Sequence, residues 1–260
     1  MITGVSRNIG KSIASKFLLK GYNVIGVCRS KTEEESLQIV GNNKCFSLYT
    51  ADFCDMLQLD KLISELKNYT FDVVINNAGM LNLGSDNNVK NEFNNFVLHE
   101  FEMVMNCNFY APLRICLELK ENIKQGGTII NIASGCGMRA TYASLSYSTS
   151  KAALINLTQS LSNSFYPYKK IRVNSVSPGW IDPDELSQMG CDKNSPGGLA
   201  AKLTSMGRNG KPQEIADVVY YLTTKQASFI NGANIVVDGG WLNHNVIYYE
   251  EATGERLLKE

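Results

Sequence analysis

Short apolar runs of strand length alternate with segments of helical periodicity along most of this chain. Apolar residues recur at steps of three and four at positions 9, 13, 14, 17 and 18, and again at 59, 62, 63 and 66, so each segment presents one apolar face. Strands that alternate with such helices predict a parallel sheet covered on both faces, a doubly wound Rossmann-type α/β fold. The predicted strands are residues 23–28, 45–49, 72–75, 128–133, 171–176 and 234–237.

The length of the chain suits one domain. Its 260 residues are 44% hydrophobic and 19% charged, which is enough apolar material for one large core. We therefore expect a single domain over residues 1–260, with a polar, glycine-containing lid at 182–210 and a tail at 241–260. Long irregular segments in a compact α/β chain usually border a binding site.

Charge and hydropathy narrow the choice of partners. Lys and Arg total 25, as do Asp and Glu, so the formal net charge is zero and supplies no general attraction to nucleic acid or anionic lipid. No apolar stretch is as long as a membrane helix, and residues 1–10 do not form a basic leader with an apolar run. We expect a cytoplasmic protein that binds a small molecule and neither nucleic acid nor membrane.

Cysteine and histidine usage argues against several kinds of site. The seven cysteines are scattered without a CxxC pair, which predicts neither a disulfide framework nor a zinc site, and we expect no metal. The sequence has two histidines, His99 and His244, and Ser134 does not stand in a G-x-S-x-G elbow. A serine or cysteine hydrolase is therefore not favoured.

A glycine-bearing turn lies at the start of the chain. Residues 3–10, Thr-Gly-Val-Ser-Arg-Asn-Ile-Gly, stand between a short apolar stretch and the first amphipathic segment. Glycines there let the backbone turn tightly and approach a pyrophosphate, which the N–H groups at the helix start can bind. Only Met1 and Ile2 precede the turn, whereas a first strand of this kind usually has about five or six residues. We expect a truncated first strand.

An ordered set of motifs resembles that of the short-chain dehydrogenases/reductases, over nearly the whole chain. The resemblance is nearest to the branch that contains the 3-oxoacyl-(acyl carrier protein) reductases. The family pattern has glycine where this chain has Asn8; because asparagine tolerates left-handed backbone, we expect the turn to form and the pyrophosphate affinity to be affected. The matching residues are Thr3-Gly4-x3-Asn8-Ile9-Gly10, Asp52-Phe53, Asn76-Asn77-Ala78-Gly79, Asn108, Ser134, Tyr147-x3-Lys151, Pro178-Gly179 and Asp238-Gly239-Gly240.

The resemblance implies catalytic roles for four residues. Tyr147 and Lys151 are one helical turn apart, so both side chains point to one face. Tyrosine needs nearby cations to act as an acid or base at neutral pH, and we expect the Lys151 ammonium and an oxidised nicotinamide ring to lower its pKa. By resemblance, Tyr147 exchanges the proton and Lys151 holds the nicotinamide ribose. Ser134 then hydrogen-bonds the reacting oxygen, and Asn108 positions a water that relays protons to Lys151.

Charge after the second predicted strand indicates the cofactor. Family members that prefer NAD usually carry an acidic residue there, whereas this chain has Cys28 followed by Arg29, Ser30 and Lys31. Guanidinium groups bind phosphate through paired hydrogen bonds, and Arg7 offers a second cation, so we expect NADP(H), with NAD(H) as the alternative. The residues expected to bind the cofactor are Gly4, Ser6, Arg7, Asn8, Ile9, Gly10, Arg29, Ser30, Asp52, Phe53, Asn76, Ala78, Gly79, Tyr147, Lys151, Pro178, Gly179 and Ile181.

The activity that this resemblance implies is hydride transfer between NADP(H) and a carbonyl or secondary alcohol. A 3-oxoacyl thioester is the substrate of the nearest branch, and a sugar, polyol or secondary-metabolite ketone is the alternative, which the polar residues 182–206 favour. A noncatalytic NADP(H)-binding regulator is the alternative from another class, and the presence of Ser134, Tyr147 and Lys151 argues against it. The family also implies a homotetramer or homodimer.

Overall fold

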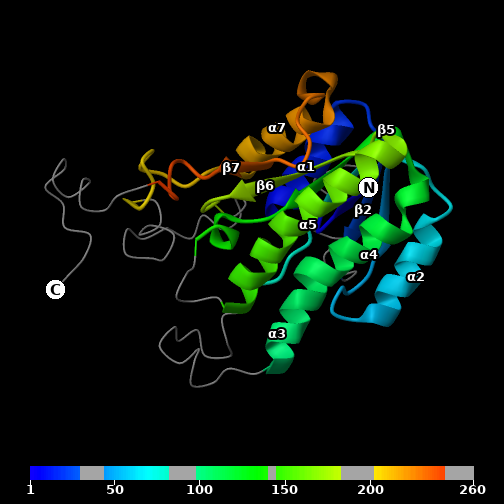
Figure 1. The fold of residues 1–260 in the computed structure, drawn as a ribbon, viewed down its shortest axis with the longest axis horizontal. Helices are drawn as coiled ribbons and strands as arrows, with labels where there is room; N and C mark the ends of the chain where they lie inside the picture. Colours follow the sequence, from blue (N-terminus) through cyan, green and yellow to red (C-terminus); the bar gives the residue numbers. More distant parts are fainter. Residues whose placement is uncertain (30–43, 82–97, 140–144, 183–201, 244–260) are drawn as a thin grey trace, which may run out of the picture.

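The computed structural model describes residues 1–29, 44–81, 98–139, 145–182 and 202–243. These residues form the predicted parallel sheet with helices on both faces (Figure 1). The sheet has seven strands in the order β3-β2-β1-β4-β5-β6-β7, and neighbouring strands pair in parallel. The strands are β1 (Ile2–Thr3), β2 (Val24–Cys28), β3 (Phe46–Thr50), β4 (Phe71–Asn76), β5 (Ile123–Ile132), β6 (Arg172–Pro178) and β7 (Asn234–Val237).

The predicted strands are confirmed, and β5 is longer than expected. The other predicted strands begin and end within two residues of the observed bounds, but β5 begins five residues early, at Ile123. Ile123 pairs with Phe71, and the register then shifts before Val73 pairs with Thr128. Gly126 has a φ of +78°, so this part of β5 lacks the regular alternation that sequence patterns detect.

The predicted helical segments at the start of the chain and after β3 are also confirmed. Tyr147 and Lys151 both lie in α5, as their spacing predicts. The helices are α1 (Asn8–Leu19), α2 (Met56–Leu66), α3 (Leu98–Met105), α4 (Ala111–Glu118), α5 (Leu145–Lys169) and α7 (Pro212–Thr223), with a π-helical turn η3 (Asn106–Tyr110) and short 3₁₀ turns η4 (Lys120–Asn122), η5 (Gly135–Gly137) and η7 (Lys225–Ala227).

The two faces of the sheet have separate apolar cores. Helices α2, α4 and α5 cover one face, where Ile63 of α2 and Ile115 of α4 are buried in one cluster with Ile129 of β5. Helices α1 and α7 cover the other face, where Ile13 and Val219 are buried against the strands. Both cores therefore hold the sheet in place, and its strand ends are left to form a site.

The first strand is short and lies in the middle of the sheet. β1 consists of Ile2 and Thr3, yet it pairs with β2 on one side and with β4 on the other. The Met1 amino group donates to the Val73 carbonyl oxygen at 2.9 Å, and the Ile75 N–H donates to the Met1 carbonyl oxygen at 2.9 Å. Burial lowers the pKa of this amino group to about 5. The expected short first strand is therefore observed.

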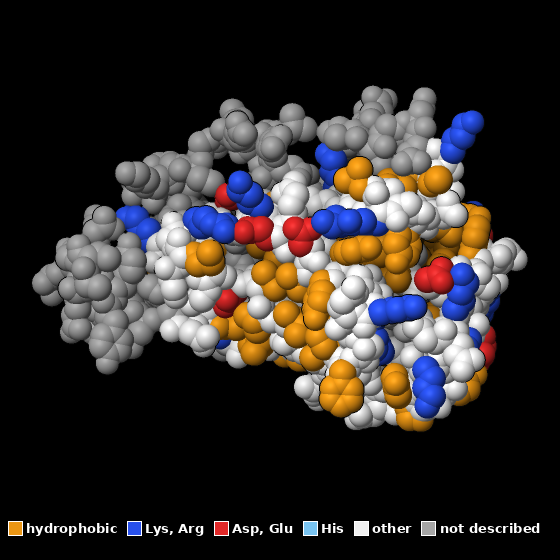
Figure 2. Space-filling model, turned by 90° about the horizontal axis from the view of Figure 1, so that it is seen from above, with side chains coloured by type: hydrophobic (Ala, Val, Ile, Leu, Met, Phe, Trp, Pro, Cys, Tyr) orange, Lys and Arg blue, Asp and Glu red, His pale blue; other side chains and the backbone are white. Residues whose placement is uncertain are grey.

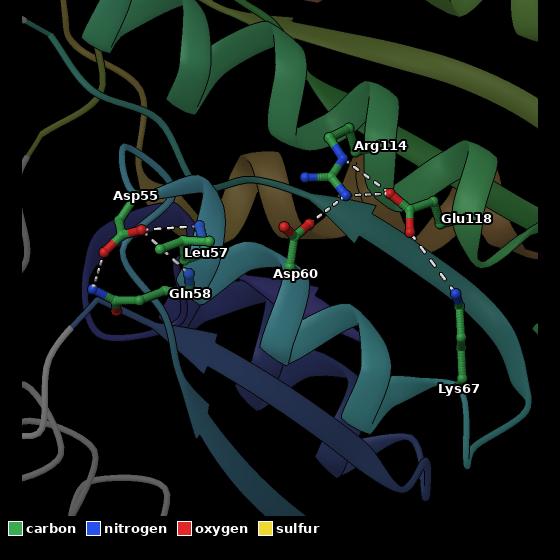
Figure 3. A network of polar contacts seen from close by, with 7 residues as sticks. All are labelled: Asp55, Leu57, Gln58, Asp60, Lys67, Arg114 and Glu118. Atoms are coloured by element: carbon green, nitrogen blue, oxygen red, sulfur yellow. Dashed lines mark hydrogen bonds and ion pairs between the residues drawn. The ribbon is translucent and has the colours of Figure 1, made fainter.

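Polar contacts join α2 to α4 near the surface (Figure 3). Asp55 precedes α2, and its carboxylate accepts from two backbone N–H groups of the first turn at 2.9 and 3.3 Å, which is an N-cap. Arg114 of α4 pairs with Asp60 of α2 and with Glu118 one turn along its own helix, each at 2.5 Å. These ion pairs connect the two helices. Because the charged groups are partly exposed, the pairs add little net stability.

The face of the molecule shown in Figure 2 carries charged side chains of both signs. Lysine and arginine side chains lie there beside acidic ones and between groups of apolar side chains, in agreement with the zero formal net charge. Within the described ranges, no helix has the length and apolar composition needed to cross a membrane.

A chain of buried hydrogen bonds joins β4, β5 and α5. Asn76 Nδ2 donates to Asn131 Oδ1 at 2.8 Å, and Asn131 Nδ2 donates to Thr158 Oγ1 at 2.9 Å. The Thr158 hydroxyl in turn donates to the backbone carbonyl oxygen one turn earlier in α5, at 2.8 Å. Because α5 also carries Tyr147 and Lys151, this chain fixes the helix that positions both side chains.

Replacing Asn131 with leucine should lower the free energy of unfolding by about 2–3 kcal/mol. The leucine keeps a similar shape but removes a buried hydrogen-bond partner of both Asn76 and Thr158. Urea unfolding measures the difference. Thr158→Val is the matched control; it takes away only the last side chain of the network and should cost about 1–2 kcal/mol. Wild-type stability in Asn131→Leu would show that the network does not stabilise the fold.

Candidate active site

A cleft of about 610 Å³ runs along the carboxyl ends of the central strands. Ligands of open parallel sheets bind at this edge, next to the point where the strand order reverses. Given the strand order, Arg29 after β2 and Ser134 after β5 lie on opposite sides of β1. The predicted site residues that line the cleft are Gly4, Ser6, Arg7, Asn8, Ile9, Gly10, Arg29, Asp52, Phe53, Ala78, Gly79, Ser134, Tyr147, Lys151, Pro178, Gly179 and Ile181.

Other predicted site residues are not part of this wall. Asn76 is buried in the hydrogen-bond chain with Asn131, and the next residue, Asn77, lines the cleft in its place. Asn108 is buried behind the wall. Ser30 lies outside the described residues, as do residues 183–201 of the expected lid and 244–260 of the expected tail.

The turn at residues 3–10 packs closely against the end of β4. Gly4 has a φ of +71°, and a Cβ there would lie 2.8 Å from Ala78 Cα. A Cβ on Gly10 would overlap the Gly4 carbonyl oxygen. Glycine is therefore required at both positions. The first turn of α1 lines the cleft, and a helix N-terminus in that position favours an anion.

Asn8 stands where the family pattern has glycine. Its φ is +54°, in the left-handed region that asparagine adopts more readily than most residues. The prediction that the turn forms with asparagine at this position is therefore confirmed. Its effect on pyrophosphate affinity stays a prediction.

Asn77 fastens the turn to β4, a role that sequence analysis did not assign. Its Nδ2 donates to the carbonyl oxygens of Thr3 and Gly4 at 2.9 and 3.0 Å. The Thr3 hydroxyl oxygen accepts from the backbone N–H groups of Asn77 and Ala78, both at 3.0 Å. The signal in the sequence was the Asn-Asn-Ala-Gly motif, whose second asparagine makes these contacts.

Ser134, Tyr147 and Lys151 line the cleft together, at the carboxyl end of β5 and the start of α5. Ser134 Oγ accepts from the Cys136 N–H at 3.1 Å, and Ser134 also hydrogen-bonds Tyr147. Lys151 Nζ donates to the Ile132 carbonyl oxygen at 2.8 Å and lies 5.6 Å from the centre of the Tyr147 ring. The site thus presents a phenol, a hydroxyl and an amine side by side.

Burial dominates the electrostatics of these groups. It lowers the pKa of Lys151, whose residue is 3% exposed, to about 8. Burial also raises the pKa of Tyr147, although the hydrogen bond with Ser134 lowers it. The sequence predicts that the Lys151 ammonium and an oxidised nicotinamide ring lower the pKa of Tyr147. Among the protein groups, burial is the larger effect and raises this pKa, because it removes a phenolate from water; the effect of the nicotinamide ring stays a prediction. Tyr147 therefore keeps its proton at neutral pH and can donate it.

Asn108 is fully buried in η3, beneath the cleft. Its Oδ1 accepts from the Met80 N–H at 2.7 Å, and its Nδ2 donates to the Met80 carbonyl oxygen at 2.9 Å and to Ser150 Oγ at 3.0 Å. Asn108 therefore ties the segment after β4 to α5. Its role in a water relay to Lys151 stays a prediction.

The residues after β2 and in the glycine turn give the cleft a basic side. The cleft is lined there by Arg7, Cys28 and Arg29. Arg7 and Arg29 are exposed. Asp52, after β3, is the only acidic residue among the described residues of the wall. Its carboxylate accepts from the Cys54 N–H at 2.9 Å. Among the described residues, those at the end of β2 therefore carry no carboxylate that would repel a phosphate.

Further residues line the cleft that sequence analysis did not single out. Several carry sulfur, and several adjoin residues that the motifs single out: Cys54 follows Phe53, Met80 follows Gly79, and Cys107 precedes Asn108. Adjacency in the sequence does not show that these side chains meet in one wall, because that depends on how distant segments pack. These lining residues are Val27, Ala51, Cys54, Asn77, Met80, Leu81, Met103, Cys107, Ile132 and Ala133.

Comparison with known proteins identifies the family. Residues 4–242 match the family model described as "Enoyl-(Acyl carrier protein) reductase". The chain belongs to the short-chain dehydrogenase/reductase family. It is accordingly an oxidoreductase that acts on CH–OH or C=O groups.

Relatives and solved structures of this family match over nearly the whole chain. The 3-oxoacyl-(acyl-carrier-protein) reductase FabG of Chlamydia trachomatis is 32% identical, with 92% of this chain and 95% of the relative covered. The 2-dehydro-3-deoxy-D-gluconate 5-dehydrogenase of Dickeya dadantii is 27% identical, with 93% and 94% covered.

Similar solved structures carry a nicotinamide cofactor. A short-chain dehydrogenase of Burkholderia cenocepacia in complex with NADP is 26% identical, with a TM-score of 0.79 and 93% and 96% of the two chains covered. A 4-hydroxyisoleucine dehydrogenase complexed with NADH is 28% identical, with a TM-score of 0.81 and 94% and 98% covered.

Replacing Lys151 with methionine should stabilise the fold at pH 7. The folded pKa of about 8 lies below the ordinary value of 10.5, so the buried charge opposes folding fully below pH 8, and this cost declines as the pH rises toward the ordinary value. We expect a gain of about 1–3 kcal/mol at pH 7 and a smaller gain at pH 10. Urea unfolding at both pH values measures it.

Lys61→Met, at an exposed position of α2, is the control and should leave stability nearly unchanged. A Lys151→Met protein less stable than wild type at pH 7 would mean that the bond to the Ile132 carbonyl outweighs the cost of burying the charge.

Proposed function

We propose that the protein uses NADP(H) to reduce the ketone of a 3-oxoacyl thioester to a secondary alcohol, and catalyses the reverse reaction. The observation that carries the proposal is that one cleft is lined both by Ser134, Tyr147 and Lys151 and by two arginines. Arg29 follows β2, across β1 from Ser134, and Arg7 lies in the turn after β1. The first group suits proton exchange with an oxygen, and the second suits a phosphate.

The turn at residues 3–10 fits a dinucleotide pyrophosphate. Its tight approach to β4 leaves no room for a Cβ at Gly4 or Gly10, and the N-terminus of α1 meets the cleft. We assign Gly4, Ser6, Asn8, Ile9 and Gly10 to the pyrophosphate, Arg7 and Arg29 to the 2'-phosphate, Asp52 and Phe53 to the adenine, Ala78 and Gly79 to the adenosine ribose, Lys151 to the nicotinamide ribose, and Pro178, Gly179 and Ile181 to the nicotinamide.

The bound nicotinamide would supply the hydride to the carbonyl carbon, or accept it from the alcohol. Tyr147 donates its phenolic proton to the carbonyl oxygen as negative charge develops there, and its raised pKa keeps the proton in place until then. The Ser134 hydroxyl hydrogen-bonds the same oxygen. The Lys151 ammonium, 5.6 Å from the ring centre, stabilises the phenolate that remains.

The preference for the phosphorylated cofactor rests on Arg7 and Arg29. Arg29 follows β2 and Arg7 lies in the glycine turn after β1. The described residues at the end of β2 carry no carboxylate, which favours a 2'-phosphate over a free hydroxyl. NAD(H) remains the alternative, since similar proteins were crystallised with either cofactor.

We propose the 3-oxoacyl thioester as substrate because two names refer to acyl carrier protein: the description of the family model and the name of the reductase of Chlamydia trachomatis. A polar sugar-acid ketone is the second candidate, favoured by the dehydrogenase of Dickeya dadantii and by the polar residues 182–206. Rates with acetoacetyl-coenzyme A and NADPH, and with 2-dehydro-3-deoxy-D-gluconate and NADP⁺ or NAD⁺, decide between them. Turnover of the sugar acid alone would overturn the first choice.

Tyr147→Phe should lower kcat by about 100-fold or more and leave NADPH affinity nearly unchanged, because it removes the transferable proton and keeps the ring. Steady-state kinetics and calorimetric titration with NADPH measure the two effects. Tyr221→Phe, at an exposed position of α7, is the matched control. A variant that kept more than about a tenth of kcat, a loss under about 1.4 kcal/mol, would rule out Tyr147 as the acid.

The same pair of proteins tests the noncatalytic alternative. A regulator that only binds NADP(H) would show equal background rates for wild type and Tyr147→Phe on every carbonyl substrate. A wild-type rate well above that of the variant would exclude this alternative.

Arg29→Ala should lower kcat/KM for NADPH by about 10- to 100-fold and change the value for NADH little, because a charge-assisted hydrogen bond is worth about 1.5–3 kcal/mol. Cys28→Asp combined with Arg29→Ile should reverse the preference by adding an acceptor for a ribose hydroxyl. Lys124→Ala removes an exposed charge paired with Asp72 and serves as the control. An unchanged cofactor ratio in Arg29→Ala would contradict the assignment.

We also propose that the chain assembles as a homotetramer or homodimer. Tyr110 beside α4, Leu117 on α4 and Tyr168 on α5 are exposed, and β7 forms an edge of the sheet with Val236 partly exposed. These surfaces could be buried by pairing of helices and of edge strands. Light scattering at micromolar concentration should give a mass of two or four chains, and a monomer would contradict the proposal.

A further inference from the structure

Two cysteines from distant parts of the sequence meet in the wall of the cleft. Cys54 lies between β3 and α2, and Cys107 lies in η3. Both line the cleft, and both are partly exposed. Cys54 Sγ lies 3.7 Å from the carbonyl oxygen of Met103, one helical turn before Cys107, and each thiol shifts the pKa of the other. The proton exchange of the proposed function uses neither side chain.

We propose that Cys54 and Cys107 form an oxidisable dithiol that closes to a disulfide when NADP(H) is absent from the cleft and is protected when it is bound. The oxidant is a peroxide. The protection by cofactor rests on the proposed function, whereas the formation of the disulfide does not. The scattered cysteines of the sequence predict no structural disulfides. We therefore assign this bond a regulatory role rather than a role in stabilising the fold.

The surroundings of the two sulfurs assign them different roles. The hydrogen bond from Cys107 lowers the pKa of Cys54, and the same contact together with burial raises the pKa of Cys107. Cys54 therefore loses its proton more readily than Cys107, and we assign it as the sulfur that reacts with the oxidant. Cys54 Sγ also lies 3.8 Å from Met80 Sδ and 3.7 Å from the Met103 carbonyl oxygen, contacts that hold it at the wall.

The chemistry needs two steps. The Cys54 thiolate attacks one oxygen of hydrogen peroxide and breaks the O–O bond, which gives a sulfenic acid on Cys54 and releases hydroxide. The Cys107 sulfur then attacks the Cys54 sulfur; its proton and the sulfenic hydroxyl leave as water, and the S–S bond forms. The hydroxide takes up the proton that Cys54 lost on ionisation, so in total two thiols are oxidised and one peroxide is reduced to two molecules of water.

The contact geometry allows this bond with a small movement. Because Cys54 Sγ already contacts the helical turn before Cys107, the two sulfurs need only a local approach to reach the S–S distance of about 2.05 Å. Closing the bond would tie the loop that carries Asp52 and Phe53 to η3, which carries Asn108. Since Asn108 fixes Met80 and α5, the cross-link would act on both the adenine side and the catalytic side of the cleft.

Other cysteines of the described chain differ in their surroundings. Cys116 is fully buried, and burial raises its pKa to about 12, so it reacts slowly. Cys45 is exposed just before β3 and does not line the cleft. It is therefore the matched control for a thiol that is accessible but outside the proposed pair.

The test treats the full chain with hydrogen peroxide in the presence of a chelator, then blocks remaining thiols and maps the peptides by mass spectrometry. We expect a cross-linked peptide pair containing Cys54 and Cys107 that dithiothreitol separates. Cys45→Ser should form the same pair and keep wild-type activity, whereas Cys54→Ser and Cys107→Ser should not form it. Overoxidation of Cys54 without a cross-link, or cross-links only to other cysteines, would overturn the dithiol.

A second arm measures the rate of cross-linking with NADP⁺ present, after calorimetry has given its Kd. At about 100 times Kd, the rate should fall on the order of 100-fold if the bound state does not react. Tight NADP⁺ binding without slower cross-linking would overturn the protection. Failure of NADP⁺ to bind would instead overturn the proposed function and its protection, while the disulfide in the first arm would stand by itself.

Discussion

The hydrogen bonds between Thr3 and Asn77 hold together the centre of this protein. β1 has two residues, so its ladder to β4 is too short to fix the glycine turn by itself. The Asn77 side chain and the Thr3 hydroxyl add four hydrogen bonds across the ends of the two strands. These four hydrogen bonds position the glycine turn, and with it the start of α1 and the close packing of Gly4 and Gly10.

The cleft contains two side chains whose burial lowers the stability of the folded protein. Lys151 is buried as a cation, and Tyr147 has its phenol removed from water, both of which oppose folding. Two apolar cores, one on each face of the sheet, supply the compensating stability. The buried chain through Asn131 and Thr158 then fixes the helix that carries both groups. Packing in the two apolar cores thus allows the sheet edge to hold the reactive side chains in a buried position.

Much of the fold could be predicted from local patterns. Strand-length apolar runs and helical stripes gave the sheet and its covering helices, because burial of one face imposes a period on the sequence. The short first strand and the shared helix of Tyr147 and Lys151 also followed from residue type and spacing. That the glycine turn forms with Asn8 followed from the family resemblance together with the tolerance of asparagine for left-handed backbone. The start of β5 did not, since Gly126 and a register shift interrupt its alternation.

The sequence by itself determined the fold, the family motifs and the helix shared by Tyr147 and Lys151. Only the tertiary structure decided that Asn77 rather than Asn76 meets the cleft, that burial raises the pKa of Tyr147, and that Cys54 contacts Cys107. These properties depend on which distant segments pack together and how much water they exclude. Periodicity and spacing carry information about one segment at a time, so neither contact partners nor desolvation can be deduced from them.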